Sequence, residues 1–245
     1  MRTLLTAALL ILFAGTGRAA GYTVVQAEDD RPVRIMCYGD SNTYGYDPEP
    51  GRDRYPESGR WPCILQQMLG DSYQIIEEGK NGRKTGYPDS TLAAAYEEGP
   101  LDLQTRLEKN QPVDMLIIML GTNDCVPGAG LSAEEIAAGM EALVTAAEDQ
   151  ADAAGIPRPS IAIVVPAAFG SELLDLYPSR DIEETIEKSH RIGDLYEEIA
   201  DRHNCLFVDA RNGIETSLLD HSHLTENGHR QLASLIFNTI FEEKT

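Results

Sequence analysis

The sequence predicts one doubly wound α/β domain, in which helices cover both faces of a parallel sheet. Short apolar runs rich in β-branched residues alternate with longer helical patterns along the chain. The 245 residues are 42% hydrophobic and 24% charged, which suits a single domain with an apolar core. The sequence shows no internal repeat, low-complexity tract or linker that would divide it further.

Five short apolar runs are the predicted strands of this sheet. Each is followed by glycine, proline or polar residues that favour a turn, and helical patterns separate most of the runs. The strands are expected at Val33–Gly39, Gln74–Gly79, Met115–Gly121, Ser160–Pro166 and Leu206–Ala210.

Three longer segments have apolar residues at three-to-four spacing and are predicted helices. Ser132 and Glu135 have the spacing of a capping box, and the helix that they open runs to about Ala154, because Gly155 and Pro157 end it. The other two helices are expected over about 181–203 and 225–241.

Residues 1–20 are expected to be a secretory signal peptide, followed by a single domain over residues 21–245. Met1 and Arg2 give the start a positive charge, an apolar run extends from Leu4 to Phe13, and small residues surround a cleavage point near Ala20. The run is shorter than the roughly 20 residues that span a bilayer, and no second run follows, so stable membrane insertion is not expected. The predicted location is therefore secreted or periplasmic.

An excess of acidic residues narrows the range of partners. The 40 Asp and Glu outnumber the 20 Lys and Arg, so the net charge is −20; loss of Arg2 and Arg18 with the signal makes it −22. Such a chain repels phosphate backbones and anionic lipid headgroups. We therefore expect no nucleic-acid partner.

Four cysteines are present, and they do not indicate a metal site. Cys37, Cys63, Cys125 and Cys205 allow three disulfide pairings if all are oxidised, and the sequence does not choose among them. Cys37 lies inside the first predicted strand, where a free thiol acts as a small buried apolar group. None of the four forms a CxxC pair, so no cysteine zinc site is expected.

Ser41 follows the first predicted strand, and in sheets of this type ligands bind outside the carboxyl ends of the strands. A serine at this turn can present its hydroxyl as a nucleophile, with the following amides favouring negative charge nearby; alternatively, it only caps the next helix. The segment is not the nucleophile elbow of common α/β hydrolases, because that motif needs glycine where Thr43 stands.

The segments after the second and third strands offer hydrogen-bond donors. The first of them is not a P-loop, because Arg83 stands where that motif needs glycine. Gly82 can instead offer an unobstructed backbone N–H, or form a plain turn. The Asn123 amide can donate to an oxyanion, while Asp124 is expected to anchor the loop; separately, either fits simple turn chemistry.

The segment after the fifth strand contains a carboxylate three residues before an imidazole. Asp220 can turn back to accept from the Nδ1–H of His223, which leaves Nε2 free to take a proton from serine. His221 and His229 compete for this role, and we interpret both as surface histidines. Asp209 is expected to anchor the end of its strand.

Together, these segments resemble the SGNH hydrolase superfamily, also called GDSL hydrolases. The superfamily has four ordered blocks, and each has a counterpart after the proper strand of this chain. The matching positions are Gly39-Asp40-Ser41, Gly82, Gly121-Thr122-Asn123-Asp124 and Asp220-His221-Ser222-His223. The segments 35–41, 76–79 and 116–124, with the region around Arg60-Trp61, are most similar to the arylesterase and acyltransferase branch.

The resemblance implies a flavodoxin-like three-layer αβα fold with a five-stranded parallel sheet, and ester hydrolysis without a metal or organic cofactor. Some relatives in this region of the superfamily deacetylate carbohydrates. The chain departs from the family pattern at Asn42, where many members have leucine. The segment from Tyr87 to Pro100 leaves the acyl and alcohol pockets undefined.

The expected function is a serine esterase that acts on short-chain, acetyl esters through Ser41, His223 and Asp220. The Ser41 and Gly82 backbone N–H groups and the Asn123 amide would form the oxyanion hole.

The expected partner is a small-molecule ester or an acetylated carbohydrate. We expect a neutral substrate unless Arg60, Arg83 or Lys84 forms a positive patch. Stacking on sugar or ordinary packing would explain the nearby aromatic residues Tyr44, Tyr46, Trp61 and Phe169.

Two alternatives remain at this point. One is a thioesterase or lysophospholipase on the same scaffold, and the other is a catalytically silent module that binds carbohydrate or a protein partner. An intact set of Ser41, His223 and Asp220 argues against the silent module, which needs none of the three. Whether the protein is a homo-oligomer is left open by the sequence.

Overall fold

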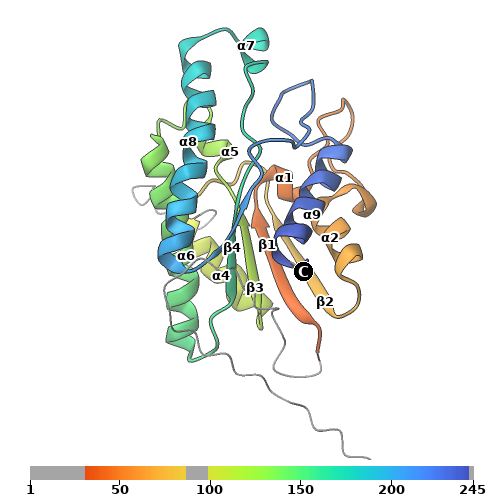
Figure 1. The fold of residues 1–245 in the computed structure, drawn as a ribbon, viewed down its shortest axis with the longest axis vertical. Helices are drawn as coiled ribbons and strands as arrows, with labels where there is room; N and C mark the ends of the chain where they lie inside the picture. Colours follow the sequence, from red (N-terminus) through yellow and green to blue (C-terminus); the bar gives the residue numbers. More distant parts are fainter. Residues whose placement is uncertain (1–30, 87–98, 243–245) are drawn as a thin grey trace, which may run out of the picture.

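A five-stranded sheet forms the centre of the computed structural model, which describes residues 31–86 and 99–242 (Figure 1). All the strand pairs are parallel, in the order β2-β1-β3-β4-β5. The expected signal peptide and nearly all of the segment from Tyr87 to Pro100 lie outside the described residues. The strands are β1 Val33–Gly39, β2 Tyr73–Gly79, β3 Met115–Met119, β4 Ser160–Val165 and β5 Leu206–Asp209. The predicted three-layer α/β fold and its five strands are confirmed.

Helices cover both faces of the sheet, as Figure 1 shows. On one face, α4, α6 and α8 pack over side chains that include Met36, Leu116 and Ile163. On the other face, α2 and α9 pack over side chains that include Ile35 and Ile117. The helices are α1 Ser41–Tyr44, α2 Trp61–Leu69, α4 Gly99–Asn110, α5 Thr122–Cys125, α6 Ala133–Ala154, α7 Leu173–Leu176, α8 Arg180–His203 and α9 Glu226–Ile240.

Local sequence signals explain where the three long helices begin, and where α6 ends. Ser132 and Glu135 form the predicted capping box at the start of α6, and Gly155 ends that helix in the left-handed conformation. The side chain of Ser179 caps α8, and that of Thr225 caps α9. The three helices predicted from sequence are therefore confirmed, each with bounds within a residue or two of those expected.

The register of the central strands aligns their carboxyl ends. Gly39, the last residue of β1, pairs with Gly79 of β2 and with Met119 of β3. A Cβ atom on Gly79 would lie 2.1 Å from the backbone nitrogen of Tyr44, so only glycine lets α1 pack this closely against β2. The chain segments that follow β1, β2 and β3 therefore emerge side by side.

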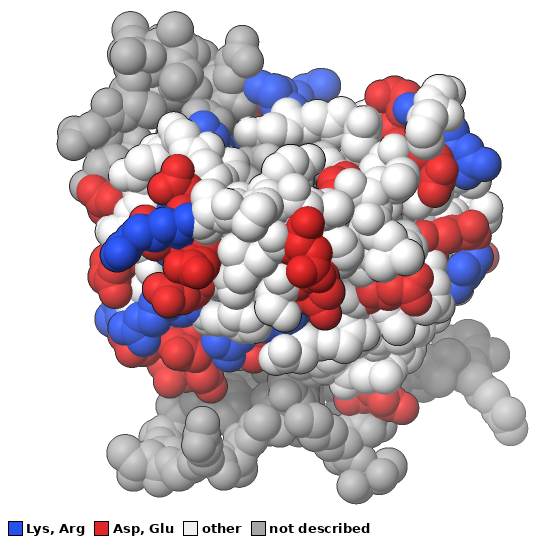
Figure 2. Space-filling model, turned by 90° about the horizontal axis from the view of Figure 1, so that it is seen from above, with Lys and Arg blue, Asp and Glu red and all other residues white. Residues whose placement is uncertain are grey.

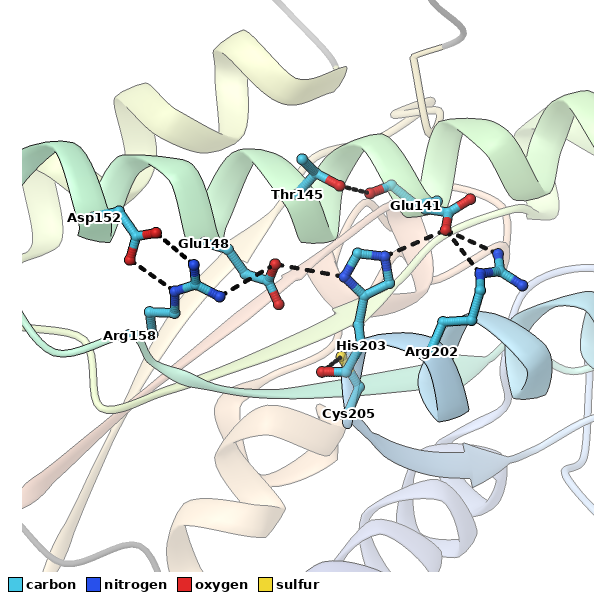
Figure 3. Close-up of polar contacts among 8 residues, drawn as sticks. All are labelled: Glu141, Thr145, Glu148, Asp152, Arg158, Arg202, His203 and Cys205. Atoms are coloured by element: carbon cyan, nitrogen blue, oxygen red, sulfur yellow. Dashed lines mark hydrogen bonds and ion pairs between the residues drawn. The ribbon is translucent and has the colours of Figure 1, made fainter.

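A polar network joins the outer helices α6 and α8 at the end of the sheet where β5 begins (Figure 3). The imidazole of His203 lies between Glu141, at 3.3 Å from Nε2, and Glu148, at 3.5 Å from Nδ1. Arg202 donates two further hydrogen bonds to Glu141. Partial burial opposes ionisation of Glu141, but its hydrogen bonds with Arg202 and His203 outweigh that effect and lower its pKa. The network fastens one helix to the other away from the carboxyl ends of the strands.

No helix within 31–86 or 99–242 combines the length and the apolar composition needed to cross a bilayer.

Candidate active site

Ser41 lies at the first turn after the central strand β1, as predicted. Asp40 precedes it as the N-cap of α1, and the Asp40 carboxylate accepts from the backbone N–H of Asn42 at 2.9 Å. The backbone N–H of Gly45 donates to the Ser41 carbonyl and closes the turn. Ser41 itself is mostly buried, so its hydroxyl is held in a defined place at the edge of the sheet.

The structure brings Ser41, His223 and Asp220 into one chain of hydrogen bonds. The Ser41 Oγ lies 3.0 Å from Nε2 of His223, and Nδ1 of the same ring lies 2.7 Å from Oδ2 of Asp220. A carboxylate can only accept a hydrogen bond, so Nδ1 carries the proton, and Nε2 of a neutral imidazole then accepts from the serine hydroxyl. This arrangement can remove a proton from Ser41.

Asp220 is held as a carboxylate by its own loop. Its Oδ1 accepts from the backbone N–H groups of Ser222 and His223, both at 3.0 Å. Half-burial of Asp220 raises its pKa, but the hydrogen bonds from His223 and Ser222 outweigh that effect, so the net pKa lies below the usual value. A negative charge is therefore maintained beside His223 at neutral pH, where it can stabilise an imidazolium.

The Tyr46 ring packs against the imidazole of His223, with ring centroids 4.6 Å apart and planes tilted by 52°. Tyr46 is one of the four aromatic residues for which the sequence allows either stacking on a sugar or ordinary packing. Its ring contacts the predicted site. Trp61 and Phe169 are buried in the core, so ordinary packing explains them, and neither can stack on a sugar at the surface.

Gly82 and Asn123 lie on neighbouring loops of the same edge. Gly82 has φ of +75°, and a Cβ there would touch nothing within 4 Å, so the backbone conformation rather than space favours glycine. The Asn123 Nδ2 donates to the carbonyl of Arg83 at 3.1 Å and makes a long 3.5 Å contact with Asp40. Asn123 therefore links the Gly82 loop to the segment that precedes Ser41.

Arg83 is an internal brace and not part of a surface patch. Its buried guanidinium donates to the carbonyls of Gly39 and Glu78, pairs with Asp102 at 3.2 Å and lies 4.0 Å from the centre of the Tyr38 ring. It thereby ties the loop after β2 to the ends of β1 and β2.

Arg60 likewise forms an ion pair within the protein, with Glu77. Its guanidinium, which is 7% exposed, donates two hydrogen bonds of 2.9 Å to Glu77. A positive patch at the site is therefore formed by neither of these two arginines.

Two buried carboxylates, those of Asp40 and Asp124, hold the loops of the site in place. Burial raises the pKa of Asp40 to about 6, although the N–H of Asn42 and the nearby His223 both favour its charged form. Asp124 accepts from the backbone N–H and the hydroxyl of Thr85, the latter at 2.7 Å. Asp124 therefore anchors a loop, as the sequence analysis expected, and Thr85 is its partner.

The prediction that His229 lies at the surface is wrong. His229 is completely buried between α9 and α2, and its Nδ1 accepts from the backbone N–H of Trp61 at 3.4 Å. Burial lowers its pKa to about 3, with further lowering by Arg60 and His223, so the ring is neutral. It lies on the apolar stripe of α9 with Leu232 and Ala233, and this spacing was a signal available in the sequence.

The remaining predictions concern His221, Asp209 and the cysteines. His221 is partly exposed, and Asp209 accepts from Arg211 at the end of β5, as expected. Cys37 is buried in β1, and all four cysteines are free thiols. Within the described ranges, no three His, Cys, Asp or Glu side chains gather as metal ligands.

Asn42 is the residue of this site whose part the sequence analysis missed. In the sequence, Asn42 stands out only because many relatives have leucine at this position. In the structure its side chain bonds to the backbone on both sides of His223, at Ser222 and Leu224. No local pattern predicts such a contact, because 180 residues separate the partners.

Comparisons with known proteins agree with this geometry. The GDSL-like Lipase/Acylhydrolase family matches residues 37–231. A carbohydrate acetylesterase from Sinorhizobium meliloti is 32% identical, with a TM-score of 0.72 over 83% of this chain and 95% of that one. An aryl esterase from M. smegmatis is 30% identical, with a TM-score of 0.70 over 84% and 99%. A putative arylesterase from Agrobacterium tumefaciens is 32% identical, with a TM-score of 0.69 over the same shares. The comparison with curated proteins gave no match.

Proposed function

Because the chain belongs to the GDSL-like lipase/acylhydrolase family and is a carboxylic ester hydrolase, we propose that it is a serine esterase for short-chain, chiefly acetyl, esters. The observation that supports the serine mechanism best is the unbroken chain of hydrogen bonds from Ser41 through His223 to Asp220. Three side chains from two distant segments meet in the order that acyl transfer needs.

The first half of the reaction transfers the acyl group to Ser41. Its Oγ attacks the ester carbonyl carbon while Nε2 of His223 takes the hydroxyl proton, and the carbonyl oxygen becomes an oxyanion. Asp220 stabilises the imidazolium that forms. When the tetrahedral intermediate collapses, the alcohol leaves with the proton from His223, and the acyl group remains as an ester on Ser41.

The second half of the reaction releases the acid. Water attacks the acyl carbon, and His223 takes a proton from this water as it adds. Collapse of the second tetrahedral intermediate returns the proton to Ser41 and frees the carboxylic acid. In both halves the oxyanion would accept from the backbone N–H groups of Ser41 and Gly82 and from the Asn123 amide. The long 3.5 Å contact between Asn123 and Asp40 is weak enough for that N–H to turn to the substrate.

Replacement of Asn123 by alanine is expected to lower kcat by about 10²–10³, or about 2.7–4 kcal/mol of transition-state stabilisation, because one oxyanion donor is lost. The measurement is the steady-state kinetics of p-nitrophenyl acetate hydrolysis, with circular dichroism as a check of folding. Asn110→Ala is a matched control, because Asn110 lies at the end of α4, where its amide bonds to Glu78 and Arg106. A folded Asn123→Ala variant with kcat near that of the wild type would refute the oxyanion role.

The acetyl preference is supported by one of the relatives, and the surface charge favours a neutral substrate. One similar structure is a carbohydrate acetylesterase, one is an aryl esterase and one is a putative arylesterase. These names indicate acetyl esters of carbohydrates for the first and aryl esters for the other two. Figure 2 views the molecule from above, from the end at which α1 and α5 follow their strands. Much of this face is uncharged, with carboxylates between and Lys and Arg toward the margins. Such a surface suits a neutral substrate better than an anionic one.

A panel of esters tests the proposed substrate class. The full chain would be assayed against p-nitrophenyl acetate, butyrate, octanoate and palmitate, and against acetylated xylo-oligosaccharides. We expect kcat/KM to be highest for acetyl and to fall with chain length, with release of acetate from the oligosaccharides. A rate that rises with acyl length would instead favour a lysophospholipase-like enzyme, and a preference for acetyl thioesters would favour a thioesterase.

We also propose that residues 1–20 are removed as a signal peptide and that the enzyme acts outside the cytoplasm. The positive start, the short apolar run and the small residues near Ala20 are the supporting features. Expression of the full chain in a bacterial host, followed by N-terminal sequencing of the periplasmic and medium fractions, would test this. A start near Gly21 is expected, and an intact protein confined to the cytoplasm would contradict the proposal.

A further inference from the structure

Asn42 follows the proposed nucleophile directly, and its buried side chain contacts a segment far away in the sequence. Its Nδ2 donates to the carbonyl of Ser222 at 3.2 Å, and its Oδ1 accepts from the backbone N–H of Leu224 at 2.9 Å. These two groups belong to the residues on either side of His223. We propose that Asn42 is a positioning residue that sets the imidazole of His223 against Ser41, an inference that rests on the proposed function.

The hydrogen bonds of Asp220 do not by themselves place the imidazole. They run to Ser222, to the His223 backbone and to the His223 ring, all within the same short loop. They shape the loop and orient the ring in it, but they do not set the distance between the loop and α1. The Asn42 side chain bonds across that gap, on both sides of the residue that must reach Ser41.

The other side of the contact is also fixed. The backbone N–H of Asn42 donates to the Asp40 carboxylate at 2.9 Å, and Asn42 is only 4% exposed. Ser41 and Asn42 are therefore held in one short turn at the end of β1. Because adjacent residues contact adjacent parts of the His223 loop, a shift of that loop would break the Asn42 bonds as well as the bond between Ser41 and His223.

The chemistry of the side chain explains why an amide suits this position. One Asn side chain supplies a donor and an acceptor, and the two backbone groups beside His223 need one of each. Leucine fills a similar volume but offers neither group. A buried N–H and a partly buried carbonyl beside His223 would then be left without these partners, and the loop would relax to satisfy them.

Two variants separate hydrogen bonding from packing. Asn42→Leu keeps most of the volume and removes both hydrogen bonds, whereas Asn42→Asp keeps the size and the acceptor for Leu224 and removes the donor to Ser222. We expect kcat for p-nitrophenyl acetate to fall about ten- to hundredfold in Asn42→Leu with little change in KM, because a displacement of the general base of about 1 Å has an effect of this order. In Asn42→Asp we expect about a three- to tenfold loss, equivalent to one hydrogen bond.

A second measurement tests the reactivity of Ser41 and His223 without an ester substrate. The rate at which a fluorophosphonate modifies Ser41 depends on proton removal by His223, and it should fall by the same factors as kcat. Thr43→Val is the matched control, because Thr43 is the next residue and its buried hydroxyl has no hydrogen-bond partner among the described residues. This control should keep the wild-type kcat and labelling rate.

The outcomes distinguish this inference from the proposed function. If Ser41→Ala is inactive but folded Asn42→Leu keeps wild-type kcat and labelling, Asn42 does not position His223. If Asn42→Leu does not fold, Asn42→Asp takes its place, and wild-type values in that variant overturn the inference. If Ser41→Ala keeps its activity in the same assay, the serine mechanism fails, and the positioning role fails with it.

Discussion

Alanine in place of Ser41 should lower kcat for p-nitrophenyl acetate by about four to six orders of magnitude, the loss seen when a serine hydrolase loses its nucleophile. The substitution removes the oxygen that lies 3.0 Å from Nε2 of His223. It spares the backbone hydrogen bonds that form the turn, in which the Gly45 N–H donates to the Ser41 carbonyl. The variant should therefore fold normally and retain only a small residual rate from binding and the oxyanion donors.

Ser171→Ala is the control for this experiment, because Ser171 is an exposed serine beyond β4. Its rate should equal that of the wild type within about twofold, the ordinary range for an exposed substitution. Stopped-flow measurement of the first turnover would show whether the missing step is acylation. A Ser41→Ala protein that still releases p-nitrophenol at a tenth of the wild-type rate or more would contradict a serine nucleophile.

Replacing Asp220 by asparagine is expected to lower kcat by about 10⁴, the effect of the same change in a well-studied Ser-His-Asp enzyme. The two carboxylate oxygens have separate tasks. Oδ1 accepts from the backbone N–H groups of Ser222 and His223, and the amide oxygen of asparagine can continue to do so. Oδ2 accepts from His223 Nδ1 at 2.7 Å, and an amide NH₂ in its place would favour the wrong tautomer and remove the charge that stabilises the imidazolium.

Asp209→Asn is the matched control for this second variant. Asp209 is a carboxylate at the carboxyl end of β5, in the part of the chain that leads to Asp220, but it bonds to Arg211 and not to an imidazole. We expect its kcat to stay within about threefold of the wild type, as is usual for a substitution outside the site. If folded Asp220→Asn lost less than tenfold in kcat, Asp220 would not be the partner of the general base.

Most of the fold could be predicted because its signals are local. The apolar runs mark β1 to β5, hydroxyl caps mark the starts of the long helices α6, α8 and α9, and a glycine marks the end of α6. The helices α2 and α4 were missed for reasons of composition. The first spans only nine residues, and the second begins with Gly99 and is largely polar.

The site could be predicted as a set of residues but not as a geometry. Ser41, Asn123, Asp220 and His223 each follow a strand, and the rule for parallel sheets places such residues at one edge. The Asn123 amide donates to the carbonyl of Arg83 and lies near the Asp40 carboxylate. These contacts join different loops, and contacts between loops leave no periodic pattern in the sequence. The same holds for the Asn42 bonds on both sides of His223.

Covalent labelling tests the central claim, that Ser41 is the acylated nucleophile, most directly. The full chain would be reacted with diethyl p-nitrophenyl phosphate, digested with trypsin and mapped by mass spectrometry. Cleavage after Arg34 and Arg52 gives a peptide of residues 35–52, in which Ser41 is the only serine. We predict one diethylphosphoryl group per chain, placed on Ser41 by fragment ions, with loss of activity in proportion and no modification of Ser41→Ala. Inactivation with the group on another residue, or with peptide 35–52 unmodified, would contradict the claim.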